Sequence, residues 1–129
     1  MIHVADTHAL VWFLEGDKRL SRRAREALSD TRVDIVIPTI VLAEVADLYN
    51  KERIDVNVDE VLASVARAAR STVYPLDLPV VQHFPSGLSI HDAIIVATAL
   101  TLRDTLHESV AAVTKDAEIT ASGLVEVIW

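Results

Sequence analysis

The sequence contains no cysteine among its 129 residues. This absence excludes disulfide bonds, thiolate metal sites and a cysteine nucleophile, and it fits a reducing compartment. Glycine and proline are scarce, with three and four copies, so the chain has little material for a flexible linker. No internal repeat or low-complexity segment interrupts it. At this length we expect one domain spanning residues 1–129.

Long apolar runs are also missing. The longest nearly uncharged run, from Val80 to Ile90, is broken by Pro85 and Gly87. No stretch reaches the ~20 apolar residues that a membrane helix requires. The first residues lead directly into a short strand-like run, without the basic and apolar regions of a signal peptide. We therefore expect a cytoplasmic protein with no membrane partner.

Positive charge is in short supply. Twelve Lys and Arg residues stand against 19 Asp and Glu residues, which gives a net charge of -7. A surface that binds nucleic acid passively is normally basic, so this balance argues against that class of protein. It leaves room for a metal-dependent nuclease, in which carboxylates bind cations and the cations meet the phosphate.

Patterns typical of strands alternate along the chain with patterns typical of helices. This alternation indicates a parallel sheet covered by helices on both faces. We therefore predict a three-layer α/β/α sandwich around a mostly parallel sheet of about five strands. The expected strands are residues 1–5, 33–37, 72–76, 110–113 and 124–128; the expected helices are residues 7–14, 21–29, 39–50, 58–70, 89–102, 117–121 and a short one within 78–88.

Two aspartates lie just beyond expected strands. Asp6 comes after the first strand, and Asp116 comes shortly after the fourth. Ligands of open parallel sheets bind beyond the carboxyl ends of the strands, so both side chains are candidates for a site at that edge. Each aspartate taken alone is equally well explained as the N-cap of the next helix.

Glu44 interrupts an apolar helix whose expected core positions include Ile40, Ala43 and Leu48. A lone buried carboxylate is costly, so this residue needs a cation or must stay protonated. The alternative is that Glu44 faces solvent beside Asp47.

Asp92 lies at the third position of the apolar helix that begins after Ser89. The run Ser89 to Asp92 has the S-x-x-D form of a capping box, which offers a structural explanation for the acid. A capping role and a metal-binding role are compatible.

Together the four acids suggest a site for Mg²⁺ or Mn²⁺, which prefer oxygen ligands and keep several waters. Such a metal neutralises a phosphate and lowers the pKa of a bound water. The five histidines form no zinc-binding spacing, and neither a G-x-S-x-G serine-hydrolase motif nor a phosphate-binding glycine loop is present.

Five sequence segments can be compared with known families by their order and spacing: residues 6–12 (DTHALVW), 38–45 (PTIVLAEV), 91–100 (HDAIIVATAL), 113–116 (VTKD) and 127–129 (VIW). In order and spacing they resemble the PIN-domain ribonucleases, specifically toxins of the VapC type found in toxin–antitoxin pairs. Many members carry Asp-Pro before the third segment and an arginine after its acid. This chain has SIHDA there, so a substrate inferred from the other pattern does not carry over.

The resemblance implies an Mg²⁺- or Mn²⁺-dependent endoribonuclease that leaves 5′-phosphate and 3′-hydroxyl ends. It also implies an antitoxin partner and a homodimer, for which helices 39–50 and 58–70 would supply apolar surface. It assigns the catalytic and metal-binding roles to Asp6, Glu44, Asp92 and Asp116, with possible support from Thr7, Thr39, Thr114 and His91.

A basic cluster precedes and opens the second helix, with Arg19, Arg22 and Arg23 among its members. These arginines are possible contacts for the RNA backbone, or they form an ordinary solvated helix face. Two alternatives to the toxin remain open: a PIN-domain nuclease of RNA processing, and a metal-free interaction module on the same fold.

Overall fold

The computed structural model describes residues 1–129 and contains one five-stranded sheet with the order β3-β2-β1-β4-β5. All four neighbouring pairs are parallel. The central strands β1 and β4 are buried at every residue, as expected for strands covered on both faces. The strands are β1 (Ile2–Ala5), β2 (Asp34–Pro38), β3 (Ser71–Tyr74), β4 (Val110–Val113) and β5 (Glu126–Ile128).

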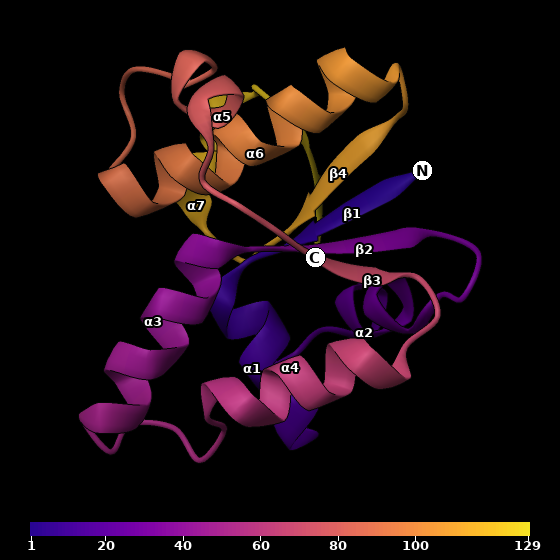
Figure 1. Cartoon of the computed structure of the whole chain (residues 1–129), viewed down its shortest axis with the longest axis vertical. Coiled ribbons are helices and arrows are strands. Elements are labelled where there is room, and N and C mark those ends of the chain that lie inside the picture. Colours follow the sequence, from indigo (N-terminus) through magenta and orange to yellow (C-terminus); the bar gives the residue numbers. More distant parts are fainter.

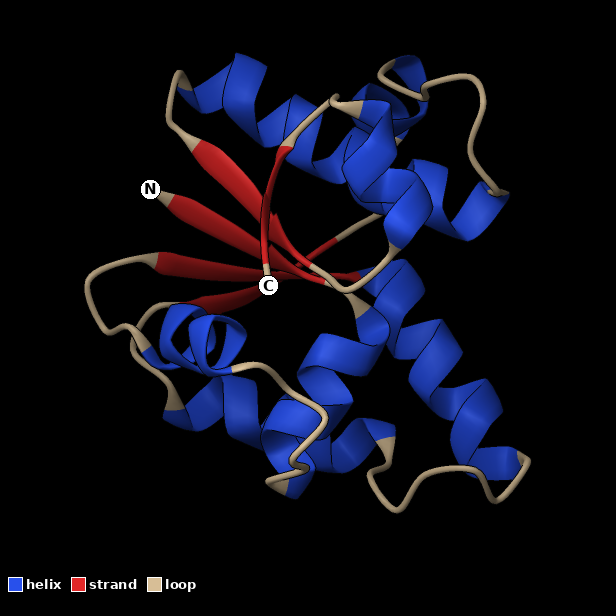
Figure 2. Ribbon diagram, turned by 180° about the vertical axis from the view of Figure 1, so that it is seen from behind, coloured by secondary structure: helices blue, strands red, loops and turns tan.

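Helices cover both faces of this sheet, which confirms the predicted three-layer α/β/α sandwich (Figures 1 and 2). The chain moves outward from β1 to β3, then returns to β4 and continues to β5. Because crossovers between parallel strands share one handedness, this reversal places the two groups of helices on opposite faces. One face carries α1 (Thr7–Glu15), α2 (Arg22–Ser29), α3 (Thr39–Asn50) and α4 (Val58–Arg67); the other carries α5 (Leu78–Gln82), α6 (Ile90–Leu106) and α7 (Ala117–Ser122).

Helix α6 is the most deeply buried helix, and it packs on β4 and β1. Its residues 93–99 are all buried, as the apolar sequence predicted, but the helix continues four residues past the expected end at Leu102. No helix in the structure is both long enough and apolar enough to cross a membrane.

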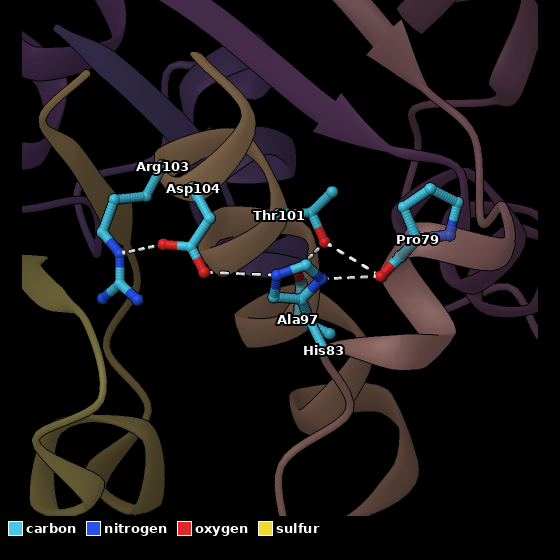
Figure 3. Close-up of polar contacts among 6 residues, drawn as sticks. All are labelled: Pro79, His83, Ala97, Thr101, Arg103 and Asp104. Carbon is cyan, nitrogen blue, oxygen red and sulfur yellow. Dashed lines mark hydrogen bonds and ion pairs between the residues drawn. The ribbon is translucent and has the colours of Figure 1, made fainter. Parts of the chain in front are cut away.

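A polar network joins α5 to α6 (Figure 3). His83 Nδ1 donates to the Pro79 carbonyl at 2.7 Å, and its Nε2 lies 3.2 Å from Asp104 Oδ2. Thr101 Oγ1 donates to the Ala97 carbonyl at 2.7 Å and lies 3.4 Å from the Pro79 carbonyl. These bonds hold the short α5 against the middle and end of α6, whose first turn carries Asp92.

Helix α4 is shorter than predicted, since it ends at Arg67 rather than Arg70. Ala68 adopts an extended conformation, and the Arg70 carbonyl accepts a hydrogen bond from Ile35 N–H at 2.8 Å. The pairing of this segment with β2 therefore competes with the helical propensity of residues 68–70 and prevails.

The predicted core positions of α3 were only partly right, because Ile40 packs against the core but Ala43 does not. Val41 and Val45 are its fully buried residues, whereas Ala43 is exposed and Ile40 and Leu48 are only partly buried. The helix is thus rotated relative to the expectation, because its apolar residues occur nearly all round and do not define one face. In α2, by contrast, Ala24, Ala27 and Leu28 are buried as predicted.

Replacing Ile95 with alanine should lower the free energy of unfolding by about 2–5 kcal/mol, because Ile95 is fully buried in α6 and its removal leaves a cavity. Ile90→Ala is a matched control on the same helix, since that side chain is 64% exposed; it should change stability by less than about 0.5 kcal/mol. Urea unfolding measures both. Equal losses in the two variants would contradict the packing described for α6.

Candidate active site

The candidate site lies where β1 and β4 end side by side. Ala5 is paired with Val113, and Asp6 N–H donates to the Val113 carbonyl at 3.1 Å. The strand order reverses between β1 and β4, so this edge is the topological switch point of the sheet, the usual ligand position in doubly wound folds. Asp6 and Asp116 both follow strands at this point, as the sequence predicted.

Thr114 connects the two aspartates. Its hydroxyl donates to Asp6 Oδ2 and accepts a hydrogen bond from Asp116 N–H at 3.0 Å. The side chain is fully buried. One hydroxyl therefore fixes both the Asp6 carboxylate and the backbone that carries Asp116.

Asp6 is buried among groups that both penalise and favour its charge. Burial raises the pKa of this carboxyl, and the nearby Asp92 raises it further. Hydrogen bonds from Thr114 and from Thr7 N–H, together with the neighbouring His8, lower this pKa only in part. Asp6 is also the N-cap of α1, which was the structural explanation for this residue that the sequence offered. Its Oδ1 accepts a hydrogen bond from Thr7 N–H at 2.6 Å.

Glu44 reaches the same site from α3. Burial raises its pKa, and the nearby Asp6 adds to that effect, whereas Thr7, His91 and His8 oppose it. Its Oε1 and the Thr7 Oγ1 are both buried without a hydrogen-bond partner. Thr7 is therefore close enough to favour the charged carboxylate but is not aligned for a hydrogen bond with it.

His91 lies on the open side of Glu44. Its Nδ1 is 3.8 Å from Glu44 Oε2, and its side chain is 55% exposed against 24% for Glu44. Both residues line a cleft of about 360 Å³ that also includes Asp47. Glu44 thus points neither into the core nor fully into bulk solvent; it forms part of the wall of an accessible cleft.

Asp92 enters from the first turn of α6, where its charge acts on Asp6. Ser89 is the N-cap of this helix, but its hydroxyl makes no capping bond and instead donates to Asp92 Oδ2 at 3.0 Å. The predicted capping box is therefore wrong in its central contact. The serine orients the carboxylate of Asp92 and leaves the backbone donors uncapped.

Asp116 differs from the other three acids. Its Oδ1 accepts from the N–H groups of Glu118 and Ile119 at 2.8 and 2.9 Å, so it caps α7. No group of three His, Asp or Glu side chains in the structure converges closely enough to bind one metal ion directly. Asp6 is within electrostatic range of Asp92 and of Glu44, and Asp116 is linked to Asp6 through Thr114.

Several expected supporting residues have other contacts. Thr39 Oγ1 accepts from Leu76 N–H at 3.1 Å and so holds the segment that follows β3. Arg22 forms an exposed ion pair with Glu26, and Arg23 forms none. Arg19 binds Asp17 through two side-chain hydrogen bonds, which lower the pKa of Asp17 to about 2.

One cluster beside the site was not predicted from the sequence. The cations of Arg19 and Lys115 lie over the indole of Trp12, at 4.7 and 5.7 Å from its centre. The rings of His8 and Trp129 also contact this indole. The position of Lys115 between Thr114 and Asp116 is the one sequence signal that points to it.

An acidic site at the switch point of a doubly wound parallel sheet defines the class of this protein. Its sequence matches the PIN domain family over residues 4–122, a range that includes all four acids. Because the match covers most of the chain, the protein belongs to the PIN-domain family.

Solved structures share this fold. The first comes from VapBC2 of Rickettsia felis, bound to a DNA fragment from its promoter, and the second from VapBC-1 of nontypeable Haemophilus influenzae. Both have a TM-score of 0.65 and 14% sequence identity to this chain. Each alignment covers 98% of this chain, and it covers 97% of the first structure's chain and 96% of the second's. At this identity the likeness concerns the fold alone. No curated protein matches the chain in sequence.

Glu44→Gln should stabilise the metal-free protein at pH 7, because it removes a charge whose pKa is raised by burial. A group with a raised folded pKa costs stability as the pH rises through that pKa, so the advantage of the variant should shrink toward pH 4. We expect no more than about 1 kcal/mol, since the carboxylate is partly solvated.

Thermal melts in EDTA between pH 4 and 8 measure this difference. Asp47→Asn is the control, because Asp47 is an exposed acid on the same helix. A pH-independent difference between wild type and Glu44→Gln would contradict the raised pKa of Glu44.

Proposed function

We propose that this protein is a metal-dependent endoribonuclease. The observation that carries the proposal is the pair of Asp6 and Glu44: burial raises the pKa of both carboxyls, Asp92 raises that of Asp6 further, and Asp6 raises that of Glu44 further. Acids buried together repel one another, and this repulsion is relieved when a cation joins them. Membership of the PIN-domain family supports the same reading.

The residues fit Mg²⁺ or Mn²⁺. Asp6, Glu44, Asp92 and Asp116 offer only oxygen atoms, which these cations prefer, and Glu44 Oε1 has no other partner. Since no three of these side chains converge on one point, waters would complete the coordination, as is usual for Mg²⁺. A bound divalent ion neutralises phosphate charge and lowers the pKa of an attacking water.

The chain itself orients these acids. Thr114 holds the Asp6 carboxylate through its hydroxyl, and Ser89 holds that of Asp92. The N-terminal N–H groups of α7 hold one oxygen of Asp116 and leave the other unbonded. These contacts limit rotation of the carboxylates, which lowers the entropy that binding would cost. The exposed ring of His91 is available for contact with RNA beside Glu44.

The reaction would be hydrolysis of a phosphodiester bond by water, without a covalent intermediate on the protein. Asp6→Asn should lower the Mg²⁺- or Mn²⁺-dependent cleavage of total RNA by at least about 100-fold, because even residues that only support metal ligands cost 10–100-fold. Asparagine can still cap α1, so the fold should persist.

The assay compares Mg²⁺, Mn²⁺ and EDTA and maps the RNA ends, which should carry 5′-phosphate and 3′-hydroxyl groups. Asp59→Asn, an exposed acid in the first turn of α4, is the control and should cleave like wild type. Full activity of Asp6→Asn would falsify the assignment.

We further propose that the protein acts as a VapC-type toxin with an antitoxin partner, and that it forms a homodimer. Both solved relatives named above come from VapBC proteins. A protein partner needs apolar surface, and the exposed apolar residues gather around α5 more than on α3 and α4. Those around α5 are Leu76, Leu78, Val81, Phe84 and Ile90.

The product of a small reading frame beside the gene should copurify with this protein and suppress its RNase activity. Co-expression followed by size-exclusion chromatography measures both the complex and the mass of the toxin alone. A nuclease that is active, monomeric and indifferent to any neighbouring product would instead favour the role in RNA processing.

A further inference from the structure

Trp12 belongs to the hydrophobic core, but its ring is also contacted by charged and aromatic side chains. It lies one helical turn after His8 on α1, and only 8% of its surface is exposed. The guanidinium carbon of Arg19 lies 4.7 Å from the centre of the indole, and the Lys115 ammonium lies 5.7 Å from it. Both distances are within the range of cation–π attraction. This arrangement, which we call the Trp12 cluster, comprises Trp12, Arg19 and Lys115.

The Trp12 cluster borders the acids. Lys115 stands between Thr114, whose hydroxyl binds Asp6, and Asp116. His8, which contacts the Trp12 ring at 5.5 Å, is close enough to Asp6 and Glu44 to lower the pKa of both carboxyls. The residues directly after β4 therefore carry both Lys115 and Asp116, and Asp6 directly precedes the helix that carries Trp12.

Lys115 is exposed and forms no ion pair. A carboxylate partner would neutralise its charge, whereas an aromatic face restricts an ammonium without neutralising it and leaves its N–H donors free. Arg19 is different, because Asp17 already binds it through two hydrogen bonds. Lys115 is thus a fixed and available positive charge on a protein whose net charge is -7.

We propose that Lys115 binds a phosphate of the RNA backbone beside the cleaved bond, and that Trp12 is a positioning residue that holds it there. Arg19, whose guanidinium is already bound by Asp17, is not part of this contact. The inference rests on the proposed ribonuclease function and explains how a protein of net negative charge can bind a polyanionic substrate. The acids would hold the metal at one phosphate, while Lys115 engages a neighbouring phosphate directly.

Salt dependence of binding separates a phosphate contact from a purely structural role. Each phosphate contact to single-stranded nucleic acid contributes about 0.7 to the slope of log affinity against log salt. Lys115→Ala should therefore weaken the binding of a labelled single-stranded RNA pool of random sequence and reduce that slope by about 0.7. Lys115→Arg should restore both, since arginine keeps the charge and also stacks on aromatic faces.

Fluorescence anisotropy in EDTA, over a series of NaCl concentrations, measures affinity and slope without metal-dependent cleavage. Arg53→Ala is the matched control, because Arg53 is exposed, forms no ion pair and follows the far end of α3. It should leave the slope unchanged. Wild-type affinity and slope in Lys115→Ala would overturn the proposal.

The role of Trp12 is tested by a double-mutant cycle with Trp12→Leu. If Trp12 acts by positioning Lys115, its substitution should weaken RNA binding clearly in the wild type and much less in the Lys115→Ala background. Equal losses in both backgrounds would overturn the positioning role. Thermal melts of each variant identify any loss that comes from unfolding.

The two proposals fail in different ways. A protein that binds RNA through Lys115 but cleaves none with Mg²⁺ or Mn²⁺ would support the phosphate contact and refute the nuclease. A protein that cleaves RNA while Lys115→Ala retains wild-type affinity and slope would support the nuclease and refute the contact.

Discussion

The parallel pairing of β1 with β4 is the constraint on which the site depends. It sets Ala5 beside Val113, so that the residues after the two strands must share one edge. The Thr114 hydroxyl then binds Asp6 and receives the N–H of Asp116. Glu44 and Asp92 approach from the first half of α3 and the first turn of α6, which start at the same edge (Figure 1). A shift in this strand register would separate Asp6 from Thr114, and it would also displace the buried side chains of β1 and β4.

The electrostatics of the molecule follow from that convergence. Burial raises the pKa of Asp6 and of Glu44, and the neighbouring acids Asp92 and Asp6, respectively, add to it. Ionisation of these acids is therefore unfavourable in the metal-free protein. Next to them in the sequence and the fold lies the Lys115 ammonium, which rests over the ring of Trp12. Excess negative charge at one point and an available positive charge next to it suit a substrate that is itself charged.

The sequence predicted the fold well because strand and helix signals alternate clearly and each signal is local. It also located Asp6 and Asp116 at the sheet edge, since any parallel sheet brings strand ends together. It was less successful where tertiary contacts decide. Residues 68–70 leave α4, and the Arg70 carbonyl bonds to β2; the apolar α3 has no face that its sequence alone can identify. The Trp12 cluster could not be predicted, because Trp12 and Lys115 meet only through the packing of α1 beside the end of β4.

The link between Thr114 and Asp6 joins residues that are 108 positions apart. During synthesis, Asp6 is made long before β4, which must then insert between β1 and the position of β5 in the sheet. Contacts of such long range form late in folding. The contact between Thr114 and Asp6 therefore cannot form on a growing chain until β4 has been made and has paired with β1.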